Sequence, residues 1–274
     1  MPTLTRRQKA TFTQTGLYLV LIVAVALVAY LLDWEKVKTN FFAPGGFGNP
    51  FKGDWGTWPE FIATGVKNTV IYTALAFVLG LTLALVLALM KISPVAPYRW
   101  LATVYIEFFR GLPALIVILV MAFGVPIAFG WQPPGGLIGA GLIALILVAG
   151  AYMAETLRAG IQAVPKGQTE AARSLGMSAG RTTVSVVLPQ AFRIVIPPLT
   201  NEFVLLIKDT ALLFVIGVEV GQRELTTVAR DLITSGPTAG TSTSLIQAAL
   251  LYLIITLPLT RLVAWLEKRQ QRAR

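Results

Sequence analysis

Four polar residues interrupt an otherwise apolar run over residues 192–218, and their spacing is suited to chemistry. Asn201 and Lys208 are seven residues apart, as are Glu202 and Asp209. On a continuous helix each pair is nearly eclipsed, which gives two neighbouring polar stripes about 100° apart. Ionisable residues inside such a helix either serve a charged solute or pair with one another. The run is therefore interpreted as a binding surface, or as a structural ion pair of Lys208 with Asp209 or Glu202.

The sequence lacks the residue types that several other chemistries need. It has no cysteine and no histidine, which excludes disulfides, thiolate catalysis, zinc sites built on these residues and an imidazole proton relay. It has no G-x-x-x-x-G-K-[ST] sequence to hold a nucleotide phosphate, so we expect ATP to be handled by another subunit. No nucleophile–base pair or metal cluster supports a membrane enzyme either.

The composition points to a bilayer as the solvent. Of the 274 residues, 55% are hydrophobic and only 13% are charged, about half the charged share of a soluble domain, which is ~25%. The mean hydropathy is +0.71 and the isoelectric point is near 10.1. The net charge of +10 would suggest nucleic acid in a soluble protein, but here it first calls for a test of how charge sorts across a membrane.

Six apolar runs approach or exceed the length of about 20 residues that a transmembrane helix needs. They cover residues 16–32, 66–90, 104–130, 136–157, 192–218 and 245–266. The first run resembles a signal peptide, but Asp33 and other charged residues follow it instead of a small-residue cleavage site, so we predict an uncleaved span. The sequence thus predicts an all-α integral membrane protein with about six transmembrane helices.

The basic residues sort to one side of these spans. With cytoplasmic termini, the cytoplasmic segments hold 16 basic and four acidic residues, and the external segments hold six basic and seven acidic residues. This asymmetry fits the positive-inside rule and explains the net charge without nucleic acid. We therefore predict a multi-pass protein of the cell membrane with both termini in the cytoplasm.

Three charged residues are predicted at the cytoplasmic mouth of a pathway. Glu155 and Arg158 are three residues apart, so they are expected to pair on one helix face. Arg110, in the stretch FFRGLP, is either an anchor that extends its charge to the membrane surface or a gate residue.

The external segment 33–65 is rich in glycine, proline and aromatic residues. One interpretation is a loop that holds Trp55 and Trp58 at the level of the lipid headgroups. The other is a docking surface for an external partner.

A polar cytoplasmic segment over residues 165–189 predicts a short helix that packs against something. Pro165 ends the preceding helix, Thr169 is predicted to cap a helix over 170–175, and Glu170 lies in its first turn. Gly176 is expected in the left-handed conformation that ends it. Ser178 is expected to cap a following helix that reaches Pro189.

An isolated helix of two turns is unstable in water, so it needs a partner surface. Ala171 and Ala172 are small enough for close approach, and Glu170, Arg173 and Ser174 share one face. The alternative is an ordinary interhelical loop with an interfacial helix.

The stretch GQTEAARSLGMSAGRTTVSVVLPQAF strongly resembles the EAA loop of ABC importer permeases, with its Glu-Ala-Ala, three residues, a glycine and a later Leu-Pro. The matching residues are Gly167, Gln168, Glu170, Ala171, Ala172, Gly176, Leu188 and Pro189. The stretches AYMAETLRAGIQAVPKGQ, IEFFRGLPALIVIL and LLIKDTALLFVIGVEV look like the polar amino acid branch of that family, of the histidine, glutamine and glutamate type. The branch usually has serine where this chain has Ala211.

The resemblance implies a type I ABC importer permease-like fold and a set of partners. In this family the EAA loop is the coupling helix, which fits a groove on a cytoplasmic ABC ATPase dimer and transmits its closure to the membrane helices. ATP and Mg would bind to that ATPase, and no cofactor or metal is expected on this chain. A second permease subunit, identical or related, an extracytoplasmic amino acid-binding protein and membrane lipid are the other expected partners, and nucleic acid is not.

The resemblance also bears on the polar stripes. Lys208-Asp209-Thr210 resembles the family's Lys-Asp-Thr, and an amino acid carries both an ammonium and a carboxylate that such residues suit. The candidate pathway residues are Asn201, Glu202, Lys208, Asp209 and Thr210, with the structural pairing left open.

The sequence therefore predicts the permease subunit of a binding-protein-dependent ABC importer for polar amino acids. The predicted organisation is an added helix and external loop over 1–60, a permease core over 61–268 and a basic tail over 269–274. The alternative is a stand-alone secondary transporter or channel for small polar solutes, but six spans without a visible repeat do not favour it.

Overall fold

The computed structural model describes residues 6–271, and the side chains of all of these except 6–13, 50 and 271. The described chain is helical, and an isolated bridge between Asn49 and Asp54 is the β contact found in it. The helices are α1 (Arg6–Leu31), α2 (Trp34–Phe41), α3 (Pro44–Phe47), α4 (Trp58–Glu60), α5 (Lys67–Ile92), α6 (Ala96–Gly111), α7 (Ala114–Leu119), α8 (Val125–Phe129), α9 (Gly136–Gln162), α10 (Lys166–Ser174), α11 (Ala179–Thr182), α12 (Leu188–Asp209), α13 (Leu225–Thr234) and α14 (Thr243–Gln271).

Shorter helical turns join several of these elements. The 3-10 turns are Pro50–Lys52, Thr210–Ile216 and Val220–Gln222, and the π turns are Phe61–Val66, Val120–Gly124 and Thr183–Val187. The last two π turns come just before Pro126 and Pro189. Because proline lacks an N–H group, the wider turn rearranges the backbone hydrogen bonds there and lets the helix continue.

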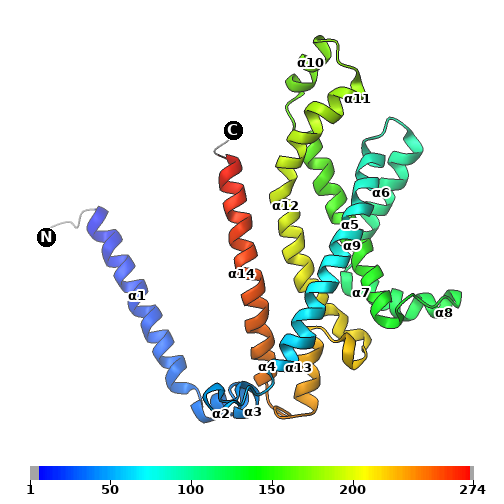
Figure 1. Cartoon of the computed structure of the whole chain (residues 1–274). Helices are drawn as coiled ribbons and strands as arrows, with labels where there is room; N and C mark the ends of the chain where they lie inside the picture. Colours follow the sequence, from blue (N-terminus) through cyan, green and yellow to red (C-terminus); the bar gives the residue numbers. More distant parts are fainter. Residues whose placement is uncertain (1–5, 272–274) are drawn as a thin grey trace.

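The long helices α5, α9, α12 and α14 form the body of the molecule, with α6 packed beside α5 and α9 (Figure 1). The helices α10 and α11 lie at one end of this body, and α2, α3 and α13 lie at the other. The described ends of the chain, Arg6 and Gln271, both lie toward the α10 end. The helix α1 diverges from the rest of the molecule (Figure 1).

The helices α5 and α9 approach each other closely at a pair of glycines. A Cβ atom on Gly80 would lie 2.9 Å from Met153 Cε and 3.5 Å from the backbone nitrogen of Gly150. A Cβ atom on Gly150 would lie 2.8 Å from Leu83 Cδ2 and 3.4 Å from the carbonyl oxygen of Gly80. Small residues let helix backbones approach closely in a bilayer, where van der Waals packing holds helices together.

Most of the predicted spans are confirmed as long helices. Within residues 6–271, four helices are long and apolar enough to cross a membrane: α1 from Gln14, α5 with the turns before it, α9 and α14. A fifth span results if α6 and the segment Ala114–Phe129 are counted together. The sixth predicted run corresponds to α12, which carries several charged residues and is not among these five.

The predicted span over 104–130 is broken in the structure. The chain bends by 103° between α6 and the segment Ala114–Phe129, because Leu112 and Pro113 are both extended. A residue before proline is disfavoured from helical geometry, so Pro113 ends α6 at Gly111.

Two prolines, Pro197 and Pro198, predict a broken or kinked helix, but α12 continues through both without a break. Pro197 removes the N–H group that would bond to the carbonyl of Arg193. The side-chain Nε2 of Gln270 on α14 donates to that carbonyl oxygen instead, at 2.5 Å. A neighbouring helix thus satisfies the freed acceptor, as expected for backbone groups in an apolar environment.

The segment between α1 and α5 is tied to the turn before α14 and to α14 itself. The backbone nitrogen of Ser242 donates to the carbonyl oxygen of Asn40 at 2.9 Å, and Gln247 Nε2 donates to the carbonyl oxygen of Gly46 at 3.0 Å. Trp58 lies in a chain of ring contacts with Phe47 and Phe61, so it packs inside the protein. The sequence grouped it with Trp55, which the structure leaves exposed.

We expect Gly150→Leu to destabilise the protein by about 1–3 kcal/mol or more, because a larger side chain would push α9 away from α5. The measurement is the midpoint of thermal unfolding of the purified chain in detergent. Gly16→Leu is the matched control, since a Cβ atom there meets no heavy atom within 4 Å. Equal midpoints for the two variants would contradict the close contact.

Candidate functional site

A cavity of about 340 Å³ lies where the break after α6 meets α9 and α12. This volume falls in the range of small-molecule sites, about 300–1,000 Å³. The lining residues are Leu112, Pro113, Ala114, Leu145, Val148, Ala149, Tyr152, Glu202, Leu205, Leu206 and Asp209. The walls are mostly apolar, and irregular backbone at the depth of a membrane is tolerated where it lines such a cavity.

Two carboxylates from α12 face this cavity. Glu202 and Asp209 both line it, and both are half-buried. They are close enough to repel one another. The cavity therefore offers two acidic groups, two helical turns apart, to a cationic group inside apolar walls.

The other predicted pathway residues do not line the cavity. Asn201 and Lys208 are exposed on the neighbouring stripe of α12, and Thr210 is buried with its hydroxyl donating to the carbonyl oxygen of Ile207 at 2.6 Å. Within the described residues, Lys208 forms no ion pair within 4 Å, so the structural pairing with Glu202 or Asp209 is not made. The structure separates the two stripes that the sequence treated together.

Arg110 lies at the rim of the cavity. Its guanidinium carbon is 5.6 Å from the ring centre of Tyr152, a lining residue, and it is near enough to Glu202 to attract that carboxylate. The Tyr152 hydroxyl donates to the carbonyl oxygen of Arg110 at 3.4 Å. The cavity thus has a positive group on one side of its acids.

An ionic layer lies one helical turn from this rim, toward the α10 end. Lys91 Nζ is 2.9 Å from Glu155 Oε2 and 3.6 Å from Glu107 Oε1. Arg158 also pairs with Glu155, which confirms the predicted contact. Lys91 joins α5, α6 and α9, and its only signal in the sequence is its place at the end of an apolar run.

The polar loop forms α10, but with a different start from the predicted one. The helix begins at Lys166 after Pro165 and not after Thr169, so Glu170 lies in the second turn. Proline at the start of a helix fits because the first N–H groups have no partner inside the helix. The predicted end is confirmed: Gly176 has φ +83°. Ser178 accepts from the backbone nitrogen of Arg181 and caps α11 as predicted, but the helical path continues past Pro189 to Asp209.

The exposed surface of α10 carries both a free charge and an apolar residue. Within the described residues, the Glu170 carboxylate makes no hydrogen bond or ion pair, whereas Arg173 donates to the carbonyl oxygen of Met177. Leu175, which the sequence analysis missed, is 85% exposed. Ala172 is buried, while Ala171 stays exposed beside Gly167 and Gln168. The exposed surface of α10 and its C-terminal end therefore offers both an unpaired carboxylate and an apolar side chain.

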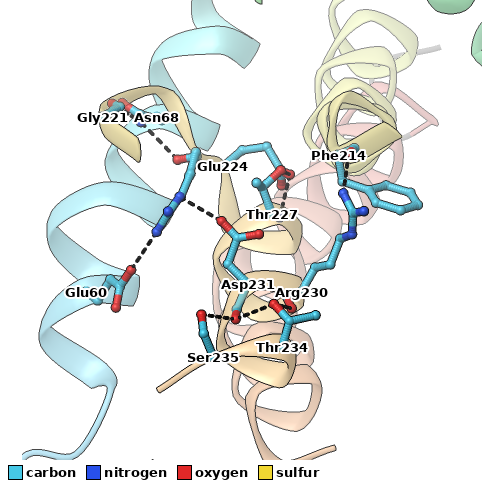
Figure 2. Close-up of polar contacts among 11 residues, drawn as sticks. Glu60, Asn68, Phe214, Gly221, Glu224, Thr227, Arg230, Asp231, Thr234 and Ser235 are labelled. Carbon is cyan, nitrogen blue, oxygen red and sulfur yellow. Dashed lines mark hydrogen bonds and ion pairs between the residues drawn. The ribbon is translucent and has the colours of Figure 1, made fainter. Parts of the chain in front are cut away.

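A second polar cluster lies at the opposite end of the molecule. Arg223 pairs with Glu60 at 3.1 Å and with Asp231 at 2.8 Å, and Figure 2 shows these two carboxylates on either side of one guanidinium. Asn68 Nδ2 donates to the carbonyl oxygens of Gly221 and Arg223, at 2.9 Å each. The cluster ties the loop before α13 to the start of α5.

Glu224 in the same region is a structural charge. Its carboxylate accepts from the backbone nitrogens of Thr226 at 2.6 Å and Thr227 at 2.7 Å, which caps α13. Complete burial raises the pKa of the Glu224 carboxyl, and the hydrogen bonds from Thr227 and Thr226 oppose that rise. No exposed surface remains on it for a ligand.

The chain resembles known proteins over most of its length. A family model described as binding-protein-dependent transport system inner membrane component matches residues 76–272. The chain is 38% identical, over 210 residues, to a probable glutamine ABC transporter permease protein of Bacillus subtilis, covering 76% of this chain and 93% of that protein. It is 37% identical, over 202 residues, to an L-cystine transport system permease protein of the same organism, covering 71% and 78%. Among solved structures, it is 38% identical to an amino acid ABC transporter with histidines, with a TM-score of 0.68 over 77% of this chain and 94% of that chain.

We expect Arg223→Met to lower stability by about 1–3 kcal/mol, because two carboxylates lose their shared partner. This figure is below that of a fully buried pair, since Glu60 and Asp231 are 39% and 34% exposed. Thermal unfolding of the purified chain is the measurement. Arg230→Met is the matched control: Arg230 is exposed and stacks on Phe214. A larger loss for the Arg230 variant would contradict the assignment.

Proposed function

The chain belongs to the family of inner membrane components of binding-protein-dependent transport systems, and on that premise we propose that it is the permease subunit of an ABC importer for polar amino acids. The observation that carries this proposal concerns α10, an exposed helix with a free charge. The link between α9 and α10 packs in one small apolar cluster with the start of α12, and α9 and α12 both line the cavity.

The apolar cluster consists of Val164, Val187 and Ala191, with Ile161 and Ile194 packed against it. Val164 lies between α9 and α10, Val187 ends the π turn before α12, and Ala191 lies in α12. Because packed side chains shift together, a displacement of α10 moves the ends of α9 and α12. These helices carry Tyr152 and the two carboxylates of the cavity.

The partner of α10 is proposed to be a cytoplasmic ABC ATPase dimer that binds ATP and Mg. Its docking surface on this chain includes Gly167, Gln168, Glu170, Ala171, Arg173 and Leu175. Ala172 packs inward, and Gly176 ends the helix with its positive φ. The free Glu170 carboxylate supplies a charge for the partner, and Leu175 supplies apolar area. Both termini and α10 are proposed to lie in the cytoplasm, in keeping with the sorting of basic residues.

The cavity is proposed to hold the amino acid during its passage. Glu202 and Asp209 suit the substrate ammonium, and Arg110 at the rim suits its carboxylate. The names of the two relatives give different substrates, glutamine and L-cystine. The shared feature of an amino acid, its ammonium and carboxylate, is therefore the part that this cavity is proposed to recognise.

A second permease subunit is proposed to cover the exposed stripe of α12. An exposed Lys208 facing lipid would cost about 2.5–3.5 kcal/mol, and Asn201 beside it also prefers a polar partner. Leu205 lies between them and lines the cavity, so the cavity would border the interface between two subunits. The opposite end, with the Arg223 cluster, is proposed to face an external amino acid-binding protein.

The proposed boundaries within the chain follow from this arrangement. The core over 61–268 is proposed to carry transport, 1–60 adds a helix and an external segment, and 269–274 forms a basic tail. Residues 272–274 of that tail lie outside the described residues.

The function is tested by reconstituting the complete complex in liposomes and measuring ATP hydrolysis against a panel of amino acids. Stimulation by one or a few polar amino acids, together with their ATP-driven uptake, is the expected result. Uptake without an ATPase subunit would overturn the proposal and favour a stand-alone transporter.

We expect Glu170→Lys to reduce ATP-driven uptake at least tenfold while the chain still inserts in the membrane. Reversing a charge on a docking surface weakens association by several kcal/mol, and 1.4 kcal/mol is already tenfold. The control is Glu267→Lys, an exposed acid near the C-terminus. Uptake per mole of inserted chain is measured, and normal uptake in the Glu170 variant would show that α10 docks without this residue.

We expect Glu202→Gln and Asp209→Asn each to lower uptake about tenfold or more, because a charge-assisted hydrogen bond is worth about 1.5–3 kcal/mol. The abundance of the folded complex should change less than uptake does. Glu219→Gln, an exposed external acid, is the control. Loss of abundance with unchanged uptake per folded complex would assign the two acids a structural role.

A further inference from the structure

The apolar surface of α1 has no protein partner within the described chain. No residue of its apolar stretch Gln14–Leu31 is buried inside the protein, whereas 67% of the most apolar stretch of α9 is buried. The family model begins at residue 76, so α1 lies outside the part that the family model matches. A helix that is apolar all round needs either lipid or protein around it.

The external end of α1 is held in place by the contacts of the following segment. Asn40 bonds to Ser242 and to the hydroxyl of Thr243 through its carbonyl oxygen, and the indole of Trp34 donates to the carbonyl oxygen of Ala29 at 2.8 Å. From this anchor α1 diverges from α14 toward the α10 end (Figure 1). The inner sides of α1 and α14 are therefore both uncovered.

The sequence of α1 is not that of a helix that packs tightly on another helix. Within Gln14–Leu31 no two small residues are four positions apart: Gly16, Ala24 and Ala26 are each followed at that distance by valine or tyrosine. Tight helix pairs in a bilayer usually rely on such small residues. Lipid is the better neighbour for this surface.

The face of α14 that points away from α12 changes from apolar to basic along its length. Leu250 and Leu257 lie on this face, followed by Arg261 and Lys268, and all four are exposed. Arg269 stacks on the ring of Trp265 at 5.3 Å, as aromatic and basic residues do at the headgroup level.

Each helix carries basic residues at the end far from the external anchor. Lys268 is 25 residues from the first residue of α14, and Arg6 is 25 residues from the last residue of α1, which is about 37 Å along each helix. Arg7 and Lys9 follow Arg6 in the sequence. Two apolar surfaces therefore diverge toward two basic ends.

We propose that α1 and α14 hold anionic phospholipids of the cytoplasmic leaflet between them, with acyl chains on the apolar surfaces and phosphate headgroups at Arg261 and Lys268. This inference rests on the orientation proposed above. The charge selects the lipid class, because basic residues between transmembrane helices on the cytoplasmic side attract anionic headgroups. We favour a lipid over free phosphate as the ligand, because only a lipid has acyl chains that cover the apolar surface of Gln14–Leu31.

The test uses the full chain in its complex, reconstituted in vesicles of phosphatidylglycerol and phosphatidylcholine in equal amounts. After extraction in mild detergent, mass spectrometry measures the ratio of the two lipids that stay bound. The ratio is expected to favour phosphatidylglycerol. In the double variant Arg261→Gln, Lys268→Gln it should fall about 25-fold, since each basic residue near the surface contributes about a fivefold preference.

The matched control is Lys36→Gln, Lys38→Gln, which removes two exposed charges at the external end and should leave the ratio unchanged. An unchanged ratio in the α14 variant, or an equal fall in the control, would overturn the proposal. So would retention of inorganic phosphate in place of lipid.

A second copy of the chain is the competing occupant. The chain contains no cysteine, so Val23→Cys and Ile254→Cys place single reactive groups on α1 and α14. Efficient cross-linking between two chains through these positions would show protein between the helices and would refute the lipid assignment. Absence of such cross-links, together with lipid selectivity, supports it.

Discussion

The contact between α5 and α9 at Gly80 and Gly150 is the constraint on which the rest of the structure depends. In a bilayer the lipid is as apolar as the side chains, so helices are held by close van der Waals packing and not by exclusion from water. Glycine at both positions permits that packing. Once α9 is fixed against α5, its exposed edge presents Tyr152, Glu155 and Arg158 in successive turns.

Charge at depth sets the second constraint, and this protein meets it in three different ways. Glu155 is neutralised by Lys91 and Arg158 from two helices. Glu224 is buried, and its carboxylate accepts the backbone hydrogen bonds that cap α13. Glu202 and Asp209 have no such partner in the described chain and face a cavity instead. Only the last arrangement leaves charge available to a solute, and for that reason the cavity is the candidate site.

Irregular backbone has a different role in two places, the break after α6 and the segment that follows α1. Pro113 ends α6 next to the cavity, where exposed backbone groups find room. At the end opposite α10, the carbonyl oxygens of Asn40 and Gly46 join the segment that follows α1 to Ser242 and to Gln247 of α14. The break after α6 borders the cavity, whereas these contacts hold the segment that follows α1.

The sequence by itself determined the class of the protein, most of its spans and the position of the polar loop that forms α10. Apolar runs as long as a bilayer is thick have few alternatives to a helix, and Gly176 and Ser178 end and start helices through local backbone chemistry. Local chemistry also explains why α6 ends before Pro113, because a residue that precedes proline disfavours helical geometry. This stretch is one apolar run in the sequence, and that run does not predict the break. The tertiary structure alone decided that α12 passes through Pro197, since the compensating Gln270 comes from 73 positions further along the chain. It alone separated Glu202 and Asp209 from Asn201 and Lys208, because helical spacing gives the angle between two stripes but not which stripe a distant helix covers.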